Sequence, residues 1–231
     1  MSLKNNIKTS FIVCLIVVTL LAFLQNCKKN TSEPNVVLIV LDTLRADHLP
    51  CYGYEHNTAP FLSQIASQGV VFENALSASS WTAPSTASIL TSLYPFQHGV
   101  TTGYLASKFF RIKINRIPAK AKTLTEVLKE TGYKTYGISD NINICRKLGF
   151  TQGFDRFKRF SYEEDWKMNS QLKEWSEEIK AQEKYFLYIH YNDCHTPLHK
   201  RAPYYREKED PLTDLIAQYD SEISYVDAKI K

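Results

Sequence analysis

The stretch Val36-Val37-Leu38-Ile39-Val40-Leu41-Asp42 decides the fold class of this chain. Its six consecutive apolar residues are mostly β-branched, and such a run predicts a strand that is buried on both faces. Asp42 comes directly after the run, where the strand should end. Because open α/β sheets bind ligands at the carboxyl ends of their strands, the carboxylate of Asp42 is a candidate metal ligand. The alternative is that Asp42 only caps the following turn.

Two further runs carry the signal of a buried strand, at residues 133–139 and 185–191. Helical signals lie between and after the strands, where Pro or a capping residue opens a segment and Gly or Pro closes it. The predicted helices cover residues 58–68, 84–93, 123–131, 162–182 and 211–230, and a short strand is predicted to begin at 70–72. Strands that alternate with helices predict an α/β fold, with a mainly parallel sheet and helices on both faces.

A hydroxyl-rich stretch, Trp81-Thr82-Ala83-Pro84-Ser85, opens the second of these helices. Pro84 suits the first turn of a helix, so Thr82 should lie at or just before the helix N-terminus. This end of a helix attracts anions, because its N–H groups have no partner within the helix and the macrodipole is positive there. A hydroxyl at this place can attack a phosphate or sulfate ester if a base or a metal ion removes its proton. The alternative is that Thr82 is only a helix cap.

Polar residues also follow the second and third predicted strands. Asn141 comes at the end of the second strand, near the place where a substrate should bind, and is a candidate substrate-binding residue. His195 and His199 follow the third strand with the spacing of zinc ligands on a helix. Pro197 lies between them and argues against a helix there. The sequence therefore predicts a site at one edge of the sheet.

The composition is that of an ordinary globular domain, with 44% hydrophobic and 23% charged residues among 231. The net charge of +4 is modest, and the sequence has no run of basic residues that would favour nucleic acid as a partner. The five cysteines form no Cys-x-x-Cys pair and have no zinc-ligand spacing. These features argue against a zinc finger and a full disulfide framework as fold classes, and they leave room for one disulfide bridge.

A series of motifs carries a family resemblance, densest between residues 34 and 100. The motifs are Pro34-Asn35 with the strand ending in Asp42, Leu44-Arg45-Ala46-Asp47-His48, Cys51-Tyr52-Gly53-Tyr54, Thr58-Ala59-Pro60-Phe61-Leu62, Gly69-Val70-Val71-Phe72, Trp81-Thr82-Ala83-Pro84-Ser85, Leu90-Thr91-Ser92-Leu93-Tyr94-Pro95 and His98-Gly99-Val100. In this order they resemble the sulfatase family of the alkaline phosphatase superfamily. The resemblance covers about residues 34–231.

The resemblance implies a role for Thr82. In the family a nucleophile attacks sulfur or phosphorus, forms a covalent intermediate and is released by hydrolysis or transfer. Sulfatases make that nucleophile from the first residue of a Cys/Ser-x-Pro-x-Arg motif, whose first, third and fifth positions are held here by Thr82, Pro84 and Thr86. Thr cannot be converted to the formylglycine aldehyde of sulfatases. Because Thr nucleophiles occur in related phosphodiesterases and phosphoethanolamine transferases, Thr82 is expected to act as a metal-activated nucleophile.

The resemblance also implies a divalent metal ion, which could be calcium, magnesium, manganese or zinc. Asp42 and Thr82 are its expected ligands. Thr43 stands where many sulfatases have a second Asp, so one carboxylate of the family's set is missing. The family often has a His followed by Pro after the third strand, on the leaving-group side of the ester. His195 is therefore a candidate catalytic residue.

The N-terminal residues predict an export segment. A basic start precedes residues 11–24, an apolar run that is short for a membrane span of about twenty residues. The next residues resemble a bacterial lipoprotein cleavage box, which implies a lipid on Cys27. We expect a signal at residues 1–27, a polar tether at 28–33 and an exported protein that is lipid-anchored to a membrane of the cell envelope. A cleaved soluble form and an uncleaved anchor are the alternatives.

Residues 34–231 are predicted to form a partial sulfatase-like catalytic domain, truncated at its C-terminal side. The family supplies further metal ligands from an Asp-His-Gly or Asp-Asn-Gly type of motif, and this sequence contains neither tripeptide. The expected function is hydrolysis of anionic sulfate or phosphate esters, weak or absent in the chain as given. The alternatives are a phosphoethanolamine-type phosphotransferase and a catalytically dead binding lipoprotein. A second chain could supply the missing half, and an exposed sheet edge should favour association.

Overall fold

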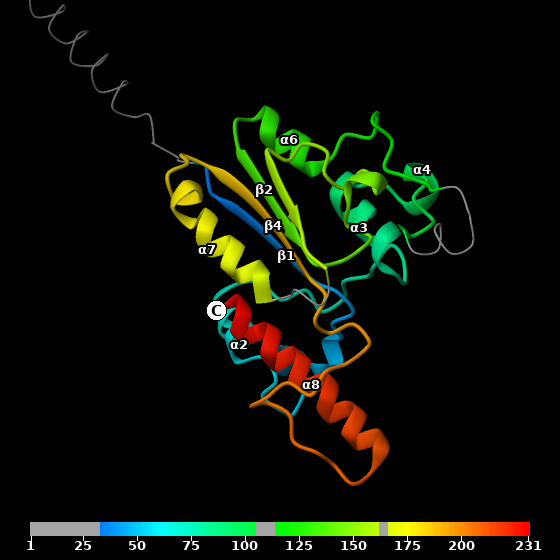
Figure 1. Cartoon of the computed structure of the whole chain (residues 1–231), viewed down its shortest axis with the longest axis vertical. Helices are drawn as coiled ribbons and strands as arrows, with labels where there is room; N and C mark the ends of the chain where they lie inside the picture. Colours follow the sequence, from blue (N-terminus) through cyan, green and yellow to red (C-terminus); the bar gives the residue numbers. More distant parts are fainter. Residues whose placement is uncertain (1–32, 105–113, 162–165) are drawn as a thin grey trace, which may run out of the picture. The chain divides into compact units, whose positions relative to one another are not determined.

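Four parallel strands form the sheet: β1 (Val36–Leu41), β2 (Lys134–Ser139), β3 (Arg156–Arg159) and β4 (Tyr185–Tyr191), in the spatial order β1-β4-β2-β3 (Figure 1). The computed structural model describes residues 33–104, 114–161 and 166–231, and those from Asn35 onward form one compact unit. The parallel pairing of β1 with β4 and of β4 with β2 confirms the predicted α/β fold.

The strand register aligns the carboxyl ends of three strands. His190 of β4 lies opposite Val40 of β1 on one side and opposite Ser139 of β2 on the other. The ladder continues one residue further, because the N–H of Asp42 donates to the carbonyl of Tyr191 at 2.9 Å. The residues that follow β1, β2 and β4 therefore emerge side by side at one edge of the sheet.

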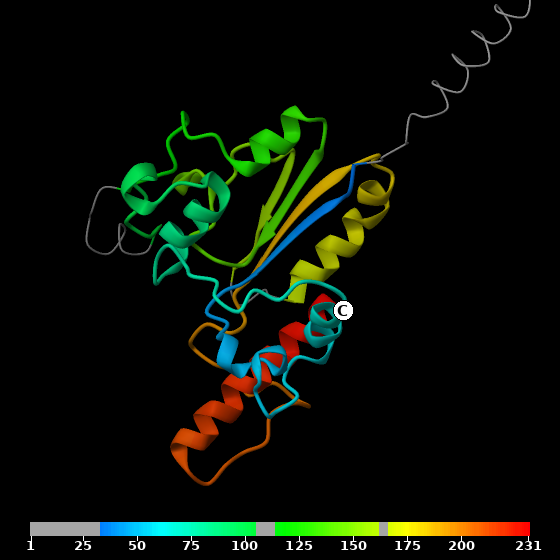
Figure 2. The same ribbon diagram turned by 180° about the vertical axis from the view of Figure 1, so that it is seen from behind.

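Helices cover both faces of the sheet, as predicted (Figures 1 and 2). The helix α7 and the C-terminal half of α8 contribute Trp175 and Val226 to the core on one face. On the other face, α3 contributes Leu90 to a second core, which α6 borders. The helices are α2 (Pro60–Gln68), α3 (Thr82–Thr91), α4 (Pro95–His98), α6 (Leu124–Glu130), α7 (Trp166–Lys180) and α8 (Pro211–Ile230), with short 3₁₀ turns η1 (Ala46–His48), η2 (Pro50–Tyr52) and η3 (Arg146–Leu148).

The start of α6 shows how local sequence fixes an element. Thr123 is the N-cap, and its hydroxyl oxygen accepts from the N–H of Glu126 at 3.2 Å. In return, the Glu126 carboxylate accepts from the N–H of Thr123 at 2.8 Å. This reciprocal pair is the predicted capping box, and it satisfies two N–H groups that the helix itself leaves without a partner.

Two strand assignments differ from the sequence prediction. The predicted strand at 70–72 is wrong: these residues are not part of a strand, and the side chains of Val70 and Phe72 are 80% and 71% exposed. An apolar, β-branched run forms a strand only where a neighbouring strand can pair with it, and the described residues place none beside it. Conversely, β3 was not predicted, because its sequence Arg-Phe-Lys-Arg is cationic rather than apolar.

Some predictions lie outside the described residues. They are the export segment with Cys27, the tether up to residue 32, and residues 162–165 of the helix predicted at 162–182. Within the part of the chain that the structure describes, every helix is too short or too polar to cross a bilayer.

Candidate functional site

Asp42 is the centre of a polar cluster at the carboxyl end of β1. Its side chain is only 11% exposed. The oxygen Oδ2 accepts from the hydroxyl of Thr82 at 2.8 Å and from the Nδ2 of Asn141 at 2.6 Å. Thr43, the next residue, has a backbone φ of +59°, which is strained for a β-branched residue. Such strain is concentrated at functional sites, and the side chain of Asp42 binds these partners instead of capping the following turn.

Thr82 is the first residue of α3. The N-cap of this helix is Trp81, and its side chain makes no capping hydrogen bond. The hydroxyl of Thr82 points across to Asp42 and donates to its carboxylate. Thr82 is therefore not the cap of this helix, and its hydroxyl faces a carboxylate at the positive end of the helix, where an anion would also be attracted.

Asn141 joins Asp42 to a second asparagine. Besides Asp42, its Nδ2 donates to the Oδ1 of Asn192 at 2.6 Å, and its Oδ1 accepts from the N–H of Asn143 at 2.9 Å. Both Asn141 and Asn192 are buried. Asn141 thus lies where the sequence predicted, next to Asp42 and Thr82, but its amide is engaged with protein partners on each side.

His190 is a member of the cluster that the sequence did not single out. It is fully buried on β4, and its Nε2 lies 3.3 Å from the Oδ2 of Asp42. Its Nδ1 lies 2.7 Å from the hydroxyl of Tyr188. A carboxylate can only accept a hydrogen bond, so Nε2 carries the proton that lies between His190 and Asp42. Burial raises the pKa of Tyr188 well above its ordinary value, so its hydroxyl stays protonated beside Nδ1.

The charge state of Asp42 follows from these contacts. Burial alone would raise the pKa of Asp42, but the hydrogen bond and charge of His190, the hydroxyl of Thr82 and the charge of His195 outweigh it. The pKa of Asp42 therefore lies below its ordinary value. At neutral pH the carboxylate is ionised, and a carboxylate with a low pKa is a weak general base.

His195 lies on the loop that follows β4. Its N–H donates to the carbonyl of Asn192 at 3.0 Å, and its ring Nδ1 lies 2.6 Å from the carbonyl oxygen of Thr196. The ring is half-buried, and its charge lowers the pKa of Asp42. His199 lies further along the loop, where its N–H donates to Glu222 at 2.6 Å.

The donor set fits a divalent cation only in part. The oxygens of Asp42 and Thr82 suit a hard cation, but ions such as magnesium and calcium take about six or more oxygens. Among the described residues, no group of three or more His, Cys, Asp or Glu side chains is placed to hold a metal ion. The residues of this cluster supply one carboxylate and neutral oxygens, and they form an incomplete metal shell.

No local sequence pattern identifies His190 and Asn192 as members of the cluster; the order of the strands does. His190 and Asn192 lie within or directly after a run of apolar residues. Their role becomes visible only when β4 is placed between β1 and β2, because that position brings both next to Asp42 and Asn141.

Comparisons with known proteins identify the family and agree with the fold. A family model described as Sulfatase matches residues 34–231. The chain is 34% identical over 107 residues to an N-acetylgalactosamine-6-O-sulfatase of Bacteroides thetaiotaomicron, covering 46% of this chain and 20% of that protein. It is 28% identical over 177 residues to an ulvan-active sulfatase of Formosa agariphila, covering 74% of this chain and 33% of the relative.

Solved structures show the same fold at low identity. Ps i-CgsB in complex with k-i-k-neocarrahexaose has a TM-score of 0.66 and 20% identity, over 85% of this chain and 53% of that one. The C-terminal periplasmic domain of EcEptC from Escherichia coli, in complex with Zn, has a TM-score of 0.60 and 16% identity, over 87% and 59%. The lipooligosaccharide phosphoethanolamine transferase EptA from Neisseria meningitidis has a TM-score of 0.61 and 17% identity, over 87% and 38%.

These relatives are longer than the chain. The chain spans a fifth to a third of the two curated relatives, and 53% and 59% of two of the structures. The family match nevertheless extends over residues 34–231, which include Asp42, Thr82, Asn141 and His195. This chain belongs to the sulfatase family.

Proposed function

We propose that the cluster around Asp42 and Thr82 is the nucleophile half of a centre that hydrolyses sulfate or phosphate esters. The observation that carries the proposal is the 2.8 Å hydrogen bond from the Thr82 hydroxyl, at the first residue of α3, to the ionised Asp42 carboxylate. In this arrangement the hydroxyl is held beside a helix N-terminus, whose N–H groups and dipole favour the oxygens of an anionic ester.

Each residue of the cluster would have a separate role. Asp42 orients the hydroxyl of Thr82, and Asn141 and His190 hold Asp42 through its Oδ2. Asn141 is thus a positioning residue in this proposal. His195 acts from the half-buried loop on the leaving-group side of the ester, where a histidine can supply a proton.

The low pKa of Asp42 means that this carboxylate alone does not activate Thr82. A divalent ion held by Asp42 and Thr82 would supply the positive charge that lowers the pKa of a bound hydroxyl. The remaining ligands would come from water or from protein outside this cluster. A structural neighbour in complex with Zn supports zinc as one of the ions to test, together with manganese, calcium and magnesium.

Transfer of phosphoethanolamine is the second candidate function. The specific observation that favours it is the threonine at position 82, because the family resemblance implies Thr nucleophiles in phosphoethanolamine transferases, and one neighbour with this fold is such a transferase. The two reactions differ in the group that moves and in its acceptor. Hydrolysis delivers sulfate or phosphate to water, whereas transfer delivers phosphoethanolamine to an alcohol, so a phosphoethanolamine donor offered with an acceptor alcohol, followed by analysis of the products, separates them.

The test uses the full chain with aryl sulfate and with aryl phosphate mono- and diesters, in the presence of each metal. We expect weak turnover that Thr82→Val abolishes and that Asp42→Asn lowers by at least about a hundredfold, the scale typical of a lost electrostatic contact in a transition state. The matched control is Thr86→Val, a buried threonine of the same helix. Turnover that survives Thr82→Val would reject Thr82 as the nucleophile.

Binding of the metal has a readout that does not depend on turnover. Calorimetric titration of the full chain is expected to show an interaction with at least one of the four ions, and Asp42→Asn should remove it. The catalytically dead binding protein becomes the better account if the metal binds and no ester is turned over.

The same proposal places the protein at the cell envelope, anchored by a lipid on Cys27. Support comes from the basic and apolar N-terminal sequence and from a structural neighbour described as a periplasmic domain. Cells that express the chain should incorporate labelled palmitate into it. Cys27→Ser should stop the labelling and Cys51→Ser should not, and labelling that persists in Cys27→Ser would reject the anchor.

A further inference from the structure

His98, the last residue of α4, is a buried histidine outside the cluster around Asp42. The residue is 1% exposed, and its Nδ1 accepts from the N–H of Val100 at 3.0 Å. A ring nitrogen that accepts a hydrogen bond carries no proton, so the proton of the neutral imidazole is on Nε2. Burial lowers the pKa of His98 below its ordinary 6.5, so the ring is neutral at neutral pH.

The Nε2–H of His98 contacts the first half of α3. It donates to the hydroxyl oxygen of Ser88 at 3.1 Å. Burial lowers the pKa of His98, and a hydrogen bond to the carbonyl of Pro84 acts in the opposite direction. This second bond also belongs to Nε2, because Nδ1 is occupied by the N–H of Val100. Pro84 is two residues after Thr82, so the ring joins α4 to the turn of α3 that begins with Thr82.

The first turn of α3 is only weakly stabilised by its own hydrogen bonds. Its N-cap residue, Trp81, makes no side-chain capping hydrogen bond. Pro84 has no N–H, and the N–H of Ser85 lies 3.3 Å from the carbonyl oxygen of Trp81. Helix ends fray where such groups have poor partners. A tertiary contact from α4 can therefore decide how firmly Thr82 is held.

The Nδ1 contact of His98 fixes the start of the segment 100–104, which packs against the N-cap of α3. At Gly103 this segment runs along the indole ring of Trp81, and a Cβ on Gly103 would lie 2.9 Å from that ring. Only glycine fits here without a shift of the ring. His98 therefore acts on α3 directly through Nε2 and on its N-cap through this segment.

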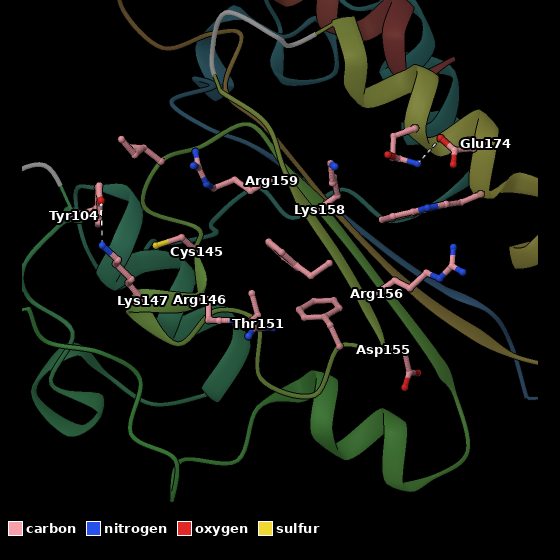
Figure 3. A pocket seen from close by; sticks show the side chains of 15 residues that line it. Tyr104, Cys145, Arg146, Lys147, Thr151, Asp155, Arg156, Lys158, Arg159 and Glu174 are labelled. Carbon is pink, nitrogen blue, oxygen red and sulfur yellow. Dashed lines mark hydrogen bonds between the residues drawn. The ribbon is translucent and has the colours of Figure 1, made fainter.

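The far end of the segment is attached to a partner of Asp42. The N–H of Tyr104 donates to the Oδ1 of Asn143 at 2.9 Å, and the N–H of Asn143 donates to the Oδ1 of Asn141 at 2.9 Å. The hydroxyl of Tyr104 also accepts from Lys147 of η3 at 3.3 Å, along the dashed line in Figure 3. The segment thus joins α4 to the asparagine that binds Asp42.

We infer that His98 is a positioning residue, which holds the first turn of α3 and so keeps the hydroxyl of Thr82 on Asp42. The inference rests on the proposed function for the chemistry of Thr82, but the order of the turn can be measured without turnover. The alternative is a purely structural histidine, which stabilises the whole domain by filling the core and has no particular effect on this turn.

Two substitutions of His98 separate its two ring nitrogens. In His98→Gln the amide nitrogen can replace Nε2 and keep a donor to α3, while the acceptor for Val100 is lost. In His98→Asn the amide oxygen can replace Nδ1 and keep the acceptor for Val100, while the donor to α3 is lost. Ser88→Ala removes one acceptor of Nε2–H and leaves the carbonyl of Pro84. Because Ser88 is only half-buried, this variant should fold in any case.

The measurement is hydrogen exchange of the α3 amides in the full chain, given as the ratio of the Ser85 rate to the Leu90 rate. We expect this ratio to rise about tenfold in His98→Asn and about threefold in Ser88→Ala, the scale of a lost and a weakened hydrogen bond. In His98→Gln the ratio should stay near its wild-type value. The control is Thr91→Val, which removes a buried hydroxyl that donates within the same helix. It should not raise the ratio, because a loss of global stability accelerates both amides.

An unchanged ratio in His98→Asn and Ser88→Ala would overturn the inference, and so would an equal rise in His98→Gln and His98→Asn. Ser88→Ala decides alone if His98→Asn does not fold. A wild-type chain that turns over no ester would reject the proposed function, and the exchange ratio would still test the hold on the turn. In an active chain, His98→Asn should lower kcat about tenfold with little change in KM, since a misplaced reacting group slows the chemical step. His98→Gln should retain kcat. A raised ratio with an unchanged kcat would show that the turn does not position Thr82, against the inference.

Discussion

At the scale of single residues, the contact between Tyr188 and His190 offers the sharpest test of the site. Both side chains are fully buried, and the Tyr188 hydroxyl lies 2.7 Å from Nδ1 of His190. Tyr188→Phe leaves Nδ1 buried with its partner removed, which costs about 1–3 kcal/mol. We expect urea unfolding to show a loss of that size. The chemical shift of Nδ1 of His190 should also change, because this nitrogen loses the hydroxyl that is its hydrogen-bond partner.

The control for this change is Tyr185→Phe on the same strand. Tyr185 is only half-buried, so loss of its hydroxyl should change the free energy of unfolding by less than about 0.5 kcal/mol. Equal stability of Tyr188→Phe and Tyr185→Phe, with an unchanged shift of Nδ1, would mean that the Tyr188 hydroxyl does not stabilise the buried ring of His190.

The residues of the site divide into those that sequence could place and those that it could not. Asp42, Thr82 and Asn141 follow strand ends or open a helix, and these are positions that local patterns identify. His190 belongs to β4 and Asn192 directly follows it, and the local pattern of this mostly apolar run says nothing of the partner strands. Which polar side chains meet depends on the strand order β1-β4-β2, which no short stretch of sequence encodes.

At the scale of elements, Asp155 ties β2 to the turn before β3. Its carboxylate accepts from the N–H of Thr135 at 3.0 Å and pairs with Lys129 at 2.6 Å. Burial would raise the pKa of Asp155, but Lys129 and Thr135 outweigh it and lower the pKa below the ordinary 3.8. The ionised carboxylate therefore adds stability that is fully present above about pH 3.8 and is lost as the pH falls through the lowered pKa.

Asp155→Asn should remove this pH dependence. We expect the wild-type chain to exceed the variant in free energy of unfolding at pH 6, and the difference to shrink at pH 3. Urea titrations at both pH values measure it, and other groups cancel because they are common to the two proteins. A difference that stays constant between pH 6 and pH 3 would contradict the lowered pKa.

A buried ionic network joins α8 to the loop that carries His195. The ammonium of Lys229 lies 2.9 and 3.0 Å from the two oxygens of Asp193, whose side chain is not exposed at all. Arg201 contacts Asp193 at 3.5 Å and Glu222 at 2.6 Å. Because Asp193 is two residues from His195, the network holds the loop that carries His195 in place. Local sequence patterns do not predict which of these charged residues pair.

Removing one partner of this network should be costly. Lys229→Met keeps the apolar stem but leaves the buried Asp193 with less compensation, and we expect a loss of about 3 kcal/mol in urea unfolding. Asp193→Asn in the same chain should restore part of that loss. The control is Lys180→Met, which breaks an exposed pair with Glu177 and should cost less than about 0.5 kcal/mol. A loss in Lys229→Met no larger than that of the control would show that the network does not stabilise the fold.

At the scale of the whole molecule, the two outer strands of the sheet present opposite surfaces. The edge strand β3 carries Arg156, Lys158 and Arg159. The other edge strand, β1, is apolar, and Val37 and Ile39 are 48% and 36% exposed. In the described residues β1 pairs only with β4. Sequence predicted this strand and its burial on both faces. The strand is confirmed, but the burial on both faces is wrong, because the face that carries Val37 and Ile39 is partly open to solvent.

An apolar open edge predicts association of the chain through β1. Unpaired N–H and C=O groups together with apolar side chains form a template for another strand, whereas a lysine on the edge opposes such pairing. We expect the purified chain to associate in a concentration-dependent manner and Val37→Lys to shift it toward the monomer in sedimentation velocity. Leu212→Lys is the matched control, because Leu212 is an apolar side chain that is 66% exposed and belongs to the helix α8 rather than to a strand. If both lysine variants reduce association equally, general surface hydrophobicity rather than the β1 edge is responsible, and a monomeric wild-type chain would contradict the prediction outright.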